Sequence, residues 1–327
     1  MQYKSNKGYT GFGQLGMILC FVGLGLILTT ILQVVIGFQI APPGTPLDKM
    51  SEAMLEAMKK PENLGAIRLM QVLSTFFLFF VPAMLFSFVC NGKNLFWLGF
   101  NKYFNVFQIL LGFLIIFTAN IMAGPLQELS EKIVIHFPKL NNVAKSLENA
   151  YNDQIIMLSH LSGIGDFISA LIIMAFFPAL FEELFFRGAI QTLLVKWWKK
   201  PLLAIVVTSV VFSLIHMSVY LLLSRIVLGF VLGWMFHQTK NIWINTIAHF
   251  LNNAIAVSQM YVLSFRKEKI DISKLDTQVD WWVGIIAIVV LFALFKFLNR
   301  YTEKNRMKII AKEQSFLITE NTAAPFS

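Results

Sequence analysis

The sequence predicts an all-α, polytopic membrane protein with about eight transmembrane helices. Of its 327 residues, 57% are hydrophobic and only 14% are charged, and the mean hydropathy is +0.67. Apolar runs long enough to cross a bilayer recur along the whole chain. Each run that faces lipid must be helical, because a single segment in lipid satisfies its own backbone hydrogen bonds only as a helix. These observations exclude a soluble globular protein.

The predicted spans follow one another from the N-terminal region to a polar tail. They cover approximately residues 15–39, 66–90, 104–126, 164–190, 201–220, 222–238, 242–263 and 281–298. The first run is too long for the core of a signal peptide and has no small-residue cleavage site, so we expect a retained span. Two longer connections, 40–65 and 127–163, are polar, and we expect short interfacial helices in the second.

The spans form one predicted transmembrane domain, residues 1–299, without an internal repeat. The tail, residues 300–327, is basic and then polar, and its composition predicts disorder. Cys20 and Cys90 both fall in predicted spans, which favours free thiols over a disulfide.

The charge distribution bears on partners and orientation. The net charge of +9 favours contact with anionic lipids, and no basic patch is interleaved with loop aromatics, as nucleic-acid binding would require. Eight spans place both termini on one side, and that side holds a small excess of basic residues, which predicts cytoplasmic termini. No organelle targeting or retention signal is evident, so we expect a bacterial plasma membrane.

Ionisable side chains are rare inside the predicted spans, and they are costly there, at about 2.5–3.5 kcal/mol for a charge at a helix centre. They are Glu182, Glu183, Arg187, His216, Arg225 and His249, with His237 at the end of a span. Glu183 and Arg187 are four residues apart and share a helix face, so we expect an ion pair. Glu182 points about 100° away from that pair and has no local partner. We expect Arg225 to snorkel or to pair with a loop carboxylate.

Polar groups on three helices lie at similar predicted depths. Glu182, His216 and Asn253 are each roughly 20 Å from connections assigned to one side of the membrane. His249 lies one turn before Asn253 on the same helix face, and Phe212 lies one turn before His216, where its ring can limit the imidazole rotamers. The pattern therefore predicts a buried polar pocket. Asn252 is expected to form an interhelical hydrogen bond instead.

Hydrolysis is the chemistry that fits such a pocket. A desolvated carboxylate is an effective general base, His216 can orient the attacking water, and His249 with Asn253 can stabilise an oxyanion. The same atoms offer an alternative, because Glu182, His216 and His249 would make a zinc site with one open position. We favour the metal-free reading and no cofactor, since HExxH, the compact zinc-protease motif, is absent.

Three motifs in this order resemble those of one family. EELFFR, FSLIH and HFLNN match EExxxR, FxxxH and HxxxN of the CPBP family, which comprises the type II CAAX prenyl endopeptidases and the bacterial Abi-type proteins similar to them. The motif-bearing core covers residues 164–261. The resemblance implies an intramembrane protease with a conical polar cavity, in which Glu182 and His216 activate water, His249 and Asn253 hold the oxyanion, and Glu183 with Arg187 braces the site.

The resemblance also implies the partner, a membrane-associated protein or peptide cut near its C-terminus or membrane segment, prenylated or not. Two other functions fit a buried Glu and His cluster. One is a proton- or ion-coupled transporter, because such residues also relay protons. The other is a catalytically idle immunity or scaffold protein of the same fold.

Overall fold

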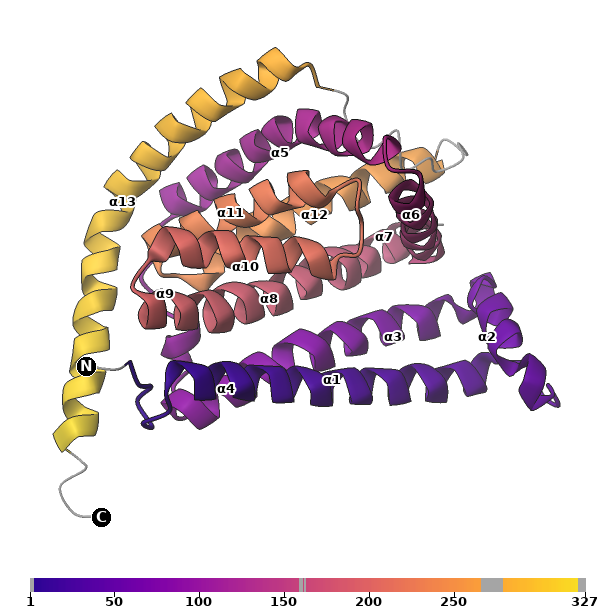
Figure 1. Ribbon diagram of the computed structural model, residues 1–327, viewed down its shortest axis with the longest axis horizontal. Coiled ribbons are helices and arrows are strands. Elements are labelled where there is room, and N and C mark those ends of the chain that lie inside the picture. The colour runs from indigo at the N-terminus through magenta and orange to yellow at the C-terminus, as the bar shows by residue number, and fades with distance from the viewer. Residues whose placement is uncertain (1–2, 159–160, 162, 266–278, 323–327) are drawn as a thin grey trace.

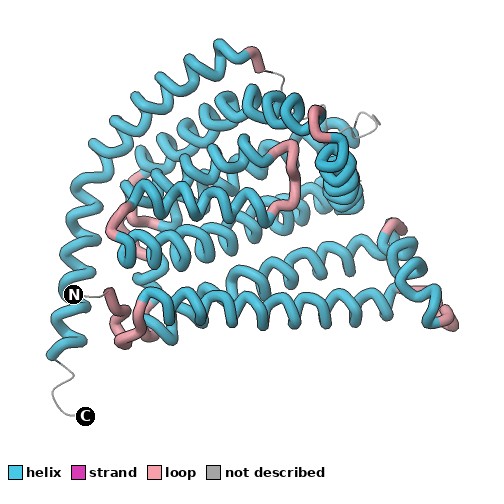
Figure 2. The backbone as a smooth tube through the Cα atoms, viewed as in Figure 1, coloured by secondary structure: helices cyan, strands magenta, loops and turns pink. Residues whose placement is uncertain are grey.

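The computed structural model describes residues 3–158, 161, 163–265 and 279–322, and these residues form an all-helical bundle (Figures 1 and 2). The prediction of an all-α fold is therefore confirmed. Between the described residues the one strand-like feature is an isolated bridge that pairs Lys4 with Thr10. Cys20 and Cys90 are free thiols.

The helices alternate in direction along the bundle. The longer ones are α1 (Gly11–Ile40), α5 (Val106–Ile135), α6 (Pro138–Leu158), α10 (Pro201–Ile215), α11 (Leu222–Thr239), α12 (Ile242–Phe265) and α13 (Trp281–Thr322). One composite helix contains α3 (Leu64–Thr75), η3 (Phe76–Phe80) and α4 (Val81–Asn91). Another contains α7 (Ile164–Ala170), η5 (Leu171–Phe176), α8 (Phe177–Glu183), η6 (Leu184–Gln191) and α9 (Thr192–Trp198). The remaining short elements are η1 (Leu47–Lys49), α2 (Met50–Met58), η2 (Pro61–Asn63) and η4 (Leu95–Leu98).

Five helical stretches of the described chain are long and apolar enough to cross a membrane. They are Gly11–Ile40, Pro61–Asn91, Val106–Ile135, Ile164–Trp198 and Trp281–Leu317. The helix α10 is apolar but shorter. Length and hydropathy thus support five of the eight predicted spans. The helices α11 and α12 pack against α5 and against α10 or α8 inside the bundle, so many of their side chains face protein rather than lipid. Their sequences are accordingly more polar.

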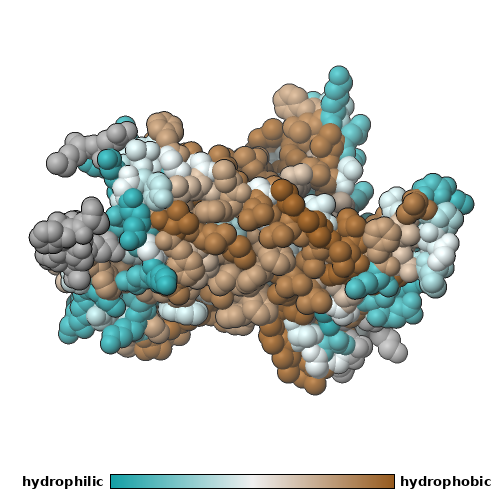
Figure 3. Space-filling model, turned by 90° about the horizontal axis from the view of Figure 1, so that it is seen from below, coloured by the Kyte–Doolittle hydropathy of each residue, from teal (hydrophilic) through white to brown (hydrophobic). Residues whose placement is uncertain are grey.

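The outer surface has the pattern of a membrane protein. Figure 3 shows an apolar band across the middle of the visible face, with hydrophilic residues concentrated at its two ends. The chain is an integral membrane protein by these features. Because the side chains that face lipid need no polar partners, the band is continuous over several helices.

The connections differ from the predicted ones. The third predicted span ends at residue 126, but α5 continues to Ile135, and most of the remaining connection is α6, which lies across one end of the bundle (Figure 1). Residues 159, 160 and 162 of that connection lie outside the described residues. The connection 40–65 contains the short helix α2 between two turns of 3-10 helix.

The prediction of a disordered tail is wrong from Arg300 to Thr322, where α13 continues without interruption. This part packs across the end of the bundle that carries both termini (Figure 1). Its Ile309 is buried against Phe96 and Trp97, and an apolar contact of this kind repays the ordering of a polar helix. Residues 323–327 lie outside the described residues.

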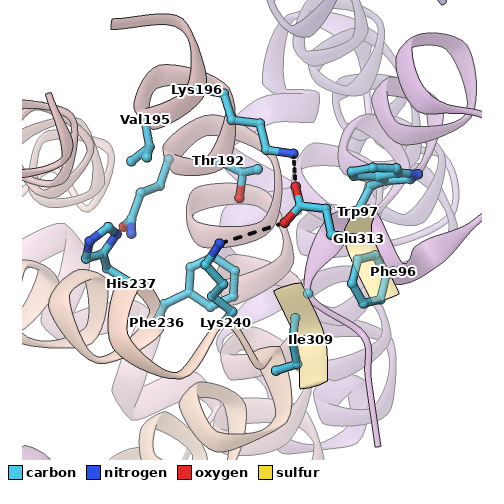
Figure 4. Close-up of a pocket in the computed structure, with 12 residues that line it drawn as sticks. Phe96, Trp97, Thr192, Val195, Lys196, Phe236, His237, Lys240, Ile309 and Glu313 are labelled. Carbon is cyan, nitrogen blue, oxygen red and sulfur yellow. Dashed lines mark hydrogen bonds and ion pairs between the residues drawn. The ribbon is translucent and has the colours of Figure 1, made fainter. Parts of the chain in front are cut away.

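At the same end, Glu313 of α13 is paired with Lys196 in the last turn of α9 and with Lys240 at the end of α11. Its carboxylate is 2.8 Å from Nζ of Lys196 and 3.8 Å from Nζ of Lys240 (Figure 4). The three charges border a cavity of about 140 Å³. Nothing in this cavity belongs to the motifs, so it is separate from the candidate site.

Candidate active site

The two glutamates of the first motif end α8, and the π-helical segment η6 begins at the next residue. A π-helical turn is wider than an α-helical one, and such turns are frequent at functional sites. The ion pair expected from the sequence is present across this junction, with Oε1 of Glu183 2.9 Å from Nη1 of Arg187. Both side chains are buried, at 0% and 1% exposed.

Glu183 is the centre of a buried polar network. Its carboxylate accepts a hydrogen bond from Nδ2 of Asn245 at 3.1 Å and contacts Nδ1 of His249 at 3.0 Å. Arg187 completes the network by donating from Nη2 to the carbonyl oxygen of Gly229 at 3.3 Å. A buried carboxylate is tolerated when it has a counter-ion and hydrogen-bond donors, and Glu183 has both. It is fully engaged and therefore suited to bracing rather than to proton transfer.

Glu182 faces two imidazoles instead. Its Oε2 atom is 4.0 Å from Nε2 of His216 and 3.9 Å from Nε2 of His249. These distances are too long for direct hydrogen bonds. The three atoms nevertheless converge from α8, from the end of α10 and from α12. The predicted depths agree with this for Glu182 and His216, whereas on α12 the converging residue is His249 and not Asn253.

The other nitrogen of each imidazole is held by an acceptor. Nδ1 of His216 is 2.7 Å from the carbonyl oxygen of Phe212, and Nδ1 of His249 faces the carboxylate of Glu183. A carbonyl or carboxylate oxygen can only accept, so we assign the Nδ1 proton to both rings. Each neutral imidazole then directs the lone pair of Nε2 towards Glu182.

The convergent side chains reach the surface, whereas the bracing network does not. The exposed fractions of the side chains are 11% for Glu182, 26% for His216 and 9% for His249. The reacting groups are thus partly accessible to a substrate, and their supports are sealed behind them.

Phe212 packs against both histidines and the bracing arginine. Its ring centroid is 4.6 Å from that of His216 and 6.3 Å from that of His249, and the guanidinium carbon of Arg187 lies 4.8 Å from it. The contact with His216 is the one that the four-residue spacing predicts. This ring limits the rotation of His216, the more exposed of the two imidazoles.

Asn253 is not brought into contact with the other predicted site residues. It is half-buried on α12, and its Oδ1 accepts from Nδ2 of Asn252 at 3.4 Å. Among the described residues its Nδ2 has no acceptor, so this donor stays available. Asn252 also accepts a hydrogen bond from Asn120 of α5, which is the interhelical contact expected of it.

Sequence reasoning missed the parts played by Asn245 and Arg225. Asn245 lies one turn before His249, and this spacing was the signal for its place on the same face. Of the two arrangements expected for Arg225, pairing with a loop carboxylate is not found among the described residues. Arg225 donates from Nη1 to the carbonyl oxygen of His216 at 3.4 Å, and its guanidinium carbon lies 4.9 Å from the ring centroid of Tyr151 on α6.

The spacing of the candidate zinc ligands is wider than zinc requires. Zinc binds nitrogen and oxygen at about 2.0–2.2 Å, so two ligands of a tetrahedral site are about 3.4 Å apart. The Nε2 atoms are 3.9 and 4.0 Å from Oε2 of Glu182. In the part of the chain that the structure describes, no three His, Cys, Asp or Glu side chains are grouped to hold a metal ion. The residues as placed do not fit a tetrahedral zinc.

One comparison with known proteins gives a match. No curated protein and no solved structure matches the chain. A family model does, over residues 164–255, and it is described as type II CAAX prenyl endopeptidase Rce1-like. The matched range contains all three motifs and nearly the whole predicted core. This match confirms the resemblance to the CPBP family, because residues 164–255 are similar to the Rce1-like type II CAAX prenyl endopeptidases.

Proposed function

We propose that this protein is a metal-free intramembrane endopeptidase, which cuts a membrane-associated protein or peptide near its C-terminus or within its membrane segment. The family match supports a protease of the CAAX type. The observation that carries the finer proposal is the convergence of Glu182 with the two Nε2 atoms at 4.0 and 3.9 Å. A water oxygen about 2.8 Å from Oε2 of Glu182 and about 2.8 Å from one Nε2 atom would make an angle of about 90° with them, which suits a water that bridges the two by hydrogen bonds.

The first step is the attack of that water on the scissile carbonyl. Glu182 takes one proton from the water, and Nε2 of His216 accepts a hydrogen bond from the other O–H group and so orients the oxygen. The new C–O bond leaves a negative charge on the carbonyl oxygen. Because Phe212 holds His216 through its ring and its carbonyl, the water is aimed before the substrate arrives.

The second step is the collapse of the tetrahedral intermediate. For this step His249 carries a second proton, taken up at Nε2 from bulk solvent before the substrate binds. It presents this Nε2–H group to the oxyanion while Glu183 stabilises its positive charge through Nδ1, and the free amide of Asn253 is assigned as the second donor. The C–N bond then breaks, and the leaving amine takes the proton from Glu182. One water is consumed, and the products are a carboxylic acid and an amine.

The place of the protein in the cell is part of the proposal. We propose that it lies in a bacterial plasma membrane, in contact with anionic lipids, with its termini in the cytoplasm and the three central helices completing an eight-span bundle around a conical polar cavity. Figure 1 shows the start of α1 and the end of α13 at one end of the bundle, whereas the connection between α10 and α11 lies at the other. Reporter fusions to either terminus test this orientation.

The test of the activity is peptide cleavage by the purified protein in detergent or liposomes. Two peptides of one sequence are compared, one prenylated on a cysteine near its C-terminus and one not, and the products are identified by mass. A single cut near the C-terminus supports the proposal. Intact peptides in the presence of folded protein would overturn it.

A further inference from the structure

Arg225 lies beside the candidate active site and has no counter-ion among the residues that the structure describes. It lies in the first turn of α11, half-buried, and its recorded partners are the carbonyl oxygen of His216 and the ring of Tyr151. No carboxylate of the described residues lies within ion-pair distance of it.

Among the described residues of α1 to α12, the other buried or half-buried arginines and lysines are paired with carboxylates. Arg187 lies 2.9 Å from Glu183, Arg68 lies 3.1 Å from Asp166, and Lys196 lies 2.8 Å from Glu313. A charge withdrawn from water costs free energy unless an opposite charge compensates it. The exception at Arg225 therefore indicates an anionic group supplied from outside the chain.

We propose that Arg225 binds the free C-terminal carboxylate of the peptide substrate, an inference that rests on the proposed protease function. Arginine presents five N–H donors in a planar fork that matches a carboxylate. One donor is used on His216, and a ring stacked on the guanidinium face leaves the edge donors free. The paired donors of the Arg225 guanidinium favour an anion with two oxygens. The C-terminus of a peptide carries such a group, and an internal peptide bond does not.

The helix α6 holds this recognition group in place. Tyr151 supplies the ring under the guanidinium, and Ser218, two residues after His216, donates to Oε2 of Glu148 at 2.9 Å. Tyr220 donates to Oδ1 of Asn141 at 2.7 Å. Through these contacts the connection between α10 and α11 is anchored to α6 on the side from which Arg225 projects.

A cycle of two enzymes and two substrates tests the inference. One peptide is made with a free C-terminal carboxylate and again with a C-terminal amide, and both are given to the wild type and to Arg225→Gln. We expect amidation to lower kcat/KM of the wild type about 10- to 100-fold, mainly through KM. Arg225→Gln should lower kcat/KM on the free-acid peptide by the same factor, and its kcat/KM on the amide peptide should equal that of the wild type. Arg225→Lys should fall between the two, and Lys145→Gln, which removes an exposed charge from α6, should behave as the wild type.

Two results would overturn the inference. One is equal cleavage of acid and amide by the wild type. The other is an equal loss on both peptides in Arg225→Gln, which would assign Arg225 to positioning His216 alone. Binding of the acid and amide peptides to Glu182→Gln, with and without Arg225→Gln, is measured by fluorescence polarisation. Binding that depends on the carboxylate and on Arg225, without any cleavage by the wild type, would uphold this site and refute the protease function. If the wild type shows no cleavage and the peptides show no binding that depends on the carboxylate and on Arg225, the carboxylate site and the protease function are both refuted.

Discussion

Nδ1 of His249 lies 3.0 Å from Oε1 of Glu183, and this contact turns the opposite edge of the ring towards Glu182. The two adjacent glutamates thus have different surroundings. Glu183 is sealed among an arginine, an amide and an imidazole, whereas Glu182 has two Nε2 atoms near it and part of its side chain exposed. The first consequence is that neighbouring carboxylates should respond differently to the same substitution.

Glu183→Gln should destabilise the fold by about 3–5 kcal/mol, because it leaves the buried charge of Arg187 without its counter-ion. The melting temperature in detergent measures this loss. A double substitution, Glu183→Met with Arg187→Met, should recover most of the stability without recovering activity. A stable single variant would show that the pair is not the brace.

His216→Gln should lower kcat about 10²- to 10⁴-fold with little change in KM, since the ring orients the water rather than the substrate. His237→Gln is the matched control. This histidine is half-buried in α11 and borders the cavity at the end of the bundle that carries the termini. Steady-state kinetics on one peptide compare the two variants. Comparable activity of both would remove His216 from the mechanism.

Chelation should leave the activity unchanged, because the ligand spacing of 3.9–4.0 Å is wider than a tetrahedral zinc site. Cleavage rates are measured after dialysis against a chelator and again after zinc is added, together with the metal content of the protein. Loss of activity on chelation, restored by a stoichiometric amount of zinc, would contradict the metal-free mechanism.

The helical end of α13 should contribute to stability. Ile309 is 3% exposed against Phe96 and Trp97, so Ile309→Ala should cost about 2–5 kcal/mol, whereas Leu317→Ala, 40% exposed on the same helix, should cost little. Thermal unfolding of the two variants gives the comparison. Equal melting temperatures would support the disordered tail that composition alone predicts.

The sequence predicted those features of the site that depend on residues near one another in the chain. The cost of charge in lipid singles out Glu182, Glu183 and Arg187, and the spacing of four residues predicts both the ion pair and the contact between Phe212 and His216. Depth along each helix predicted that Glu182 and His216 lie near each other, but on α12 it selected Asn253, where the structure has His249 one turn earlier. These features depend only on helix geometry and on the polarity of the solvent.

What the sequence could not give depends on tertiary partners. The composition of residues 300–327 reads as disorder because the apolar partners of Ile309 lie about two hundred residues away in the chain. The ring under Arg225 comes from α6, across a connection with no recognisable contact pattern. The hydrogen bond of Asn245 depends on where the Glu183 side chain points. Glu183 lies directly before the π-helical segment η6, and a departure from α-helical geometry at this place is not readable from the sequence.

Replacement of Glu182 tests the central claim most directly. We compare the single-turnover cleavage rate of Glu182→Gln with that of Glu128→Gln, whose carboxylate on α5 is exposed and paired with Lys132. The mechanism predicts a fall of at least about 10³-fold for the first variant at an unchanged melting temperature, and no change for the second. A Glu182→Gln protein that cuts the peptide within tenfold of the wild-type rate would contradict it.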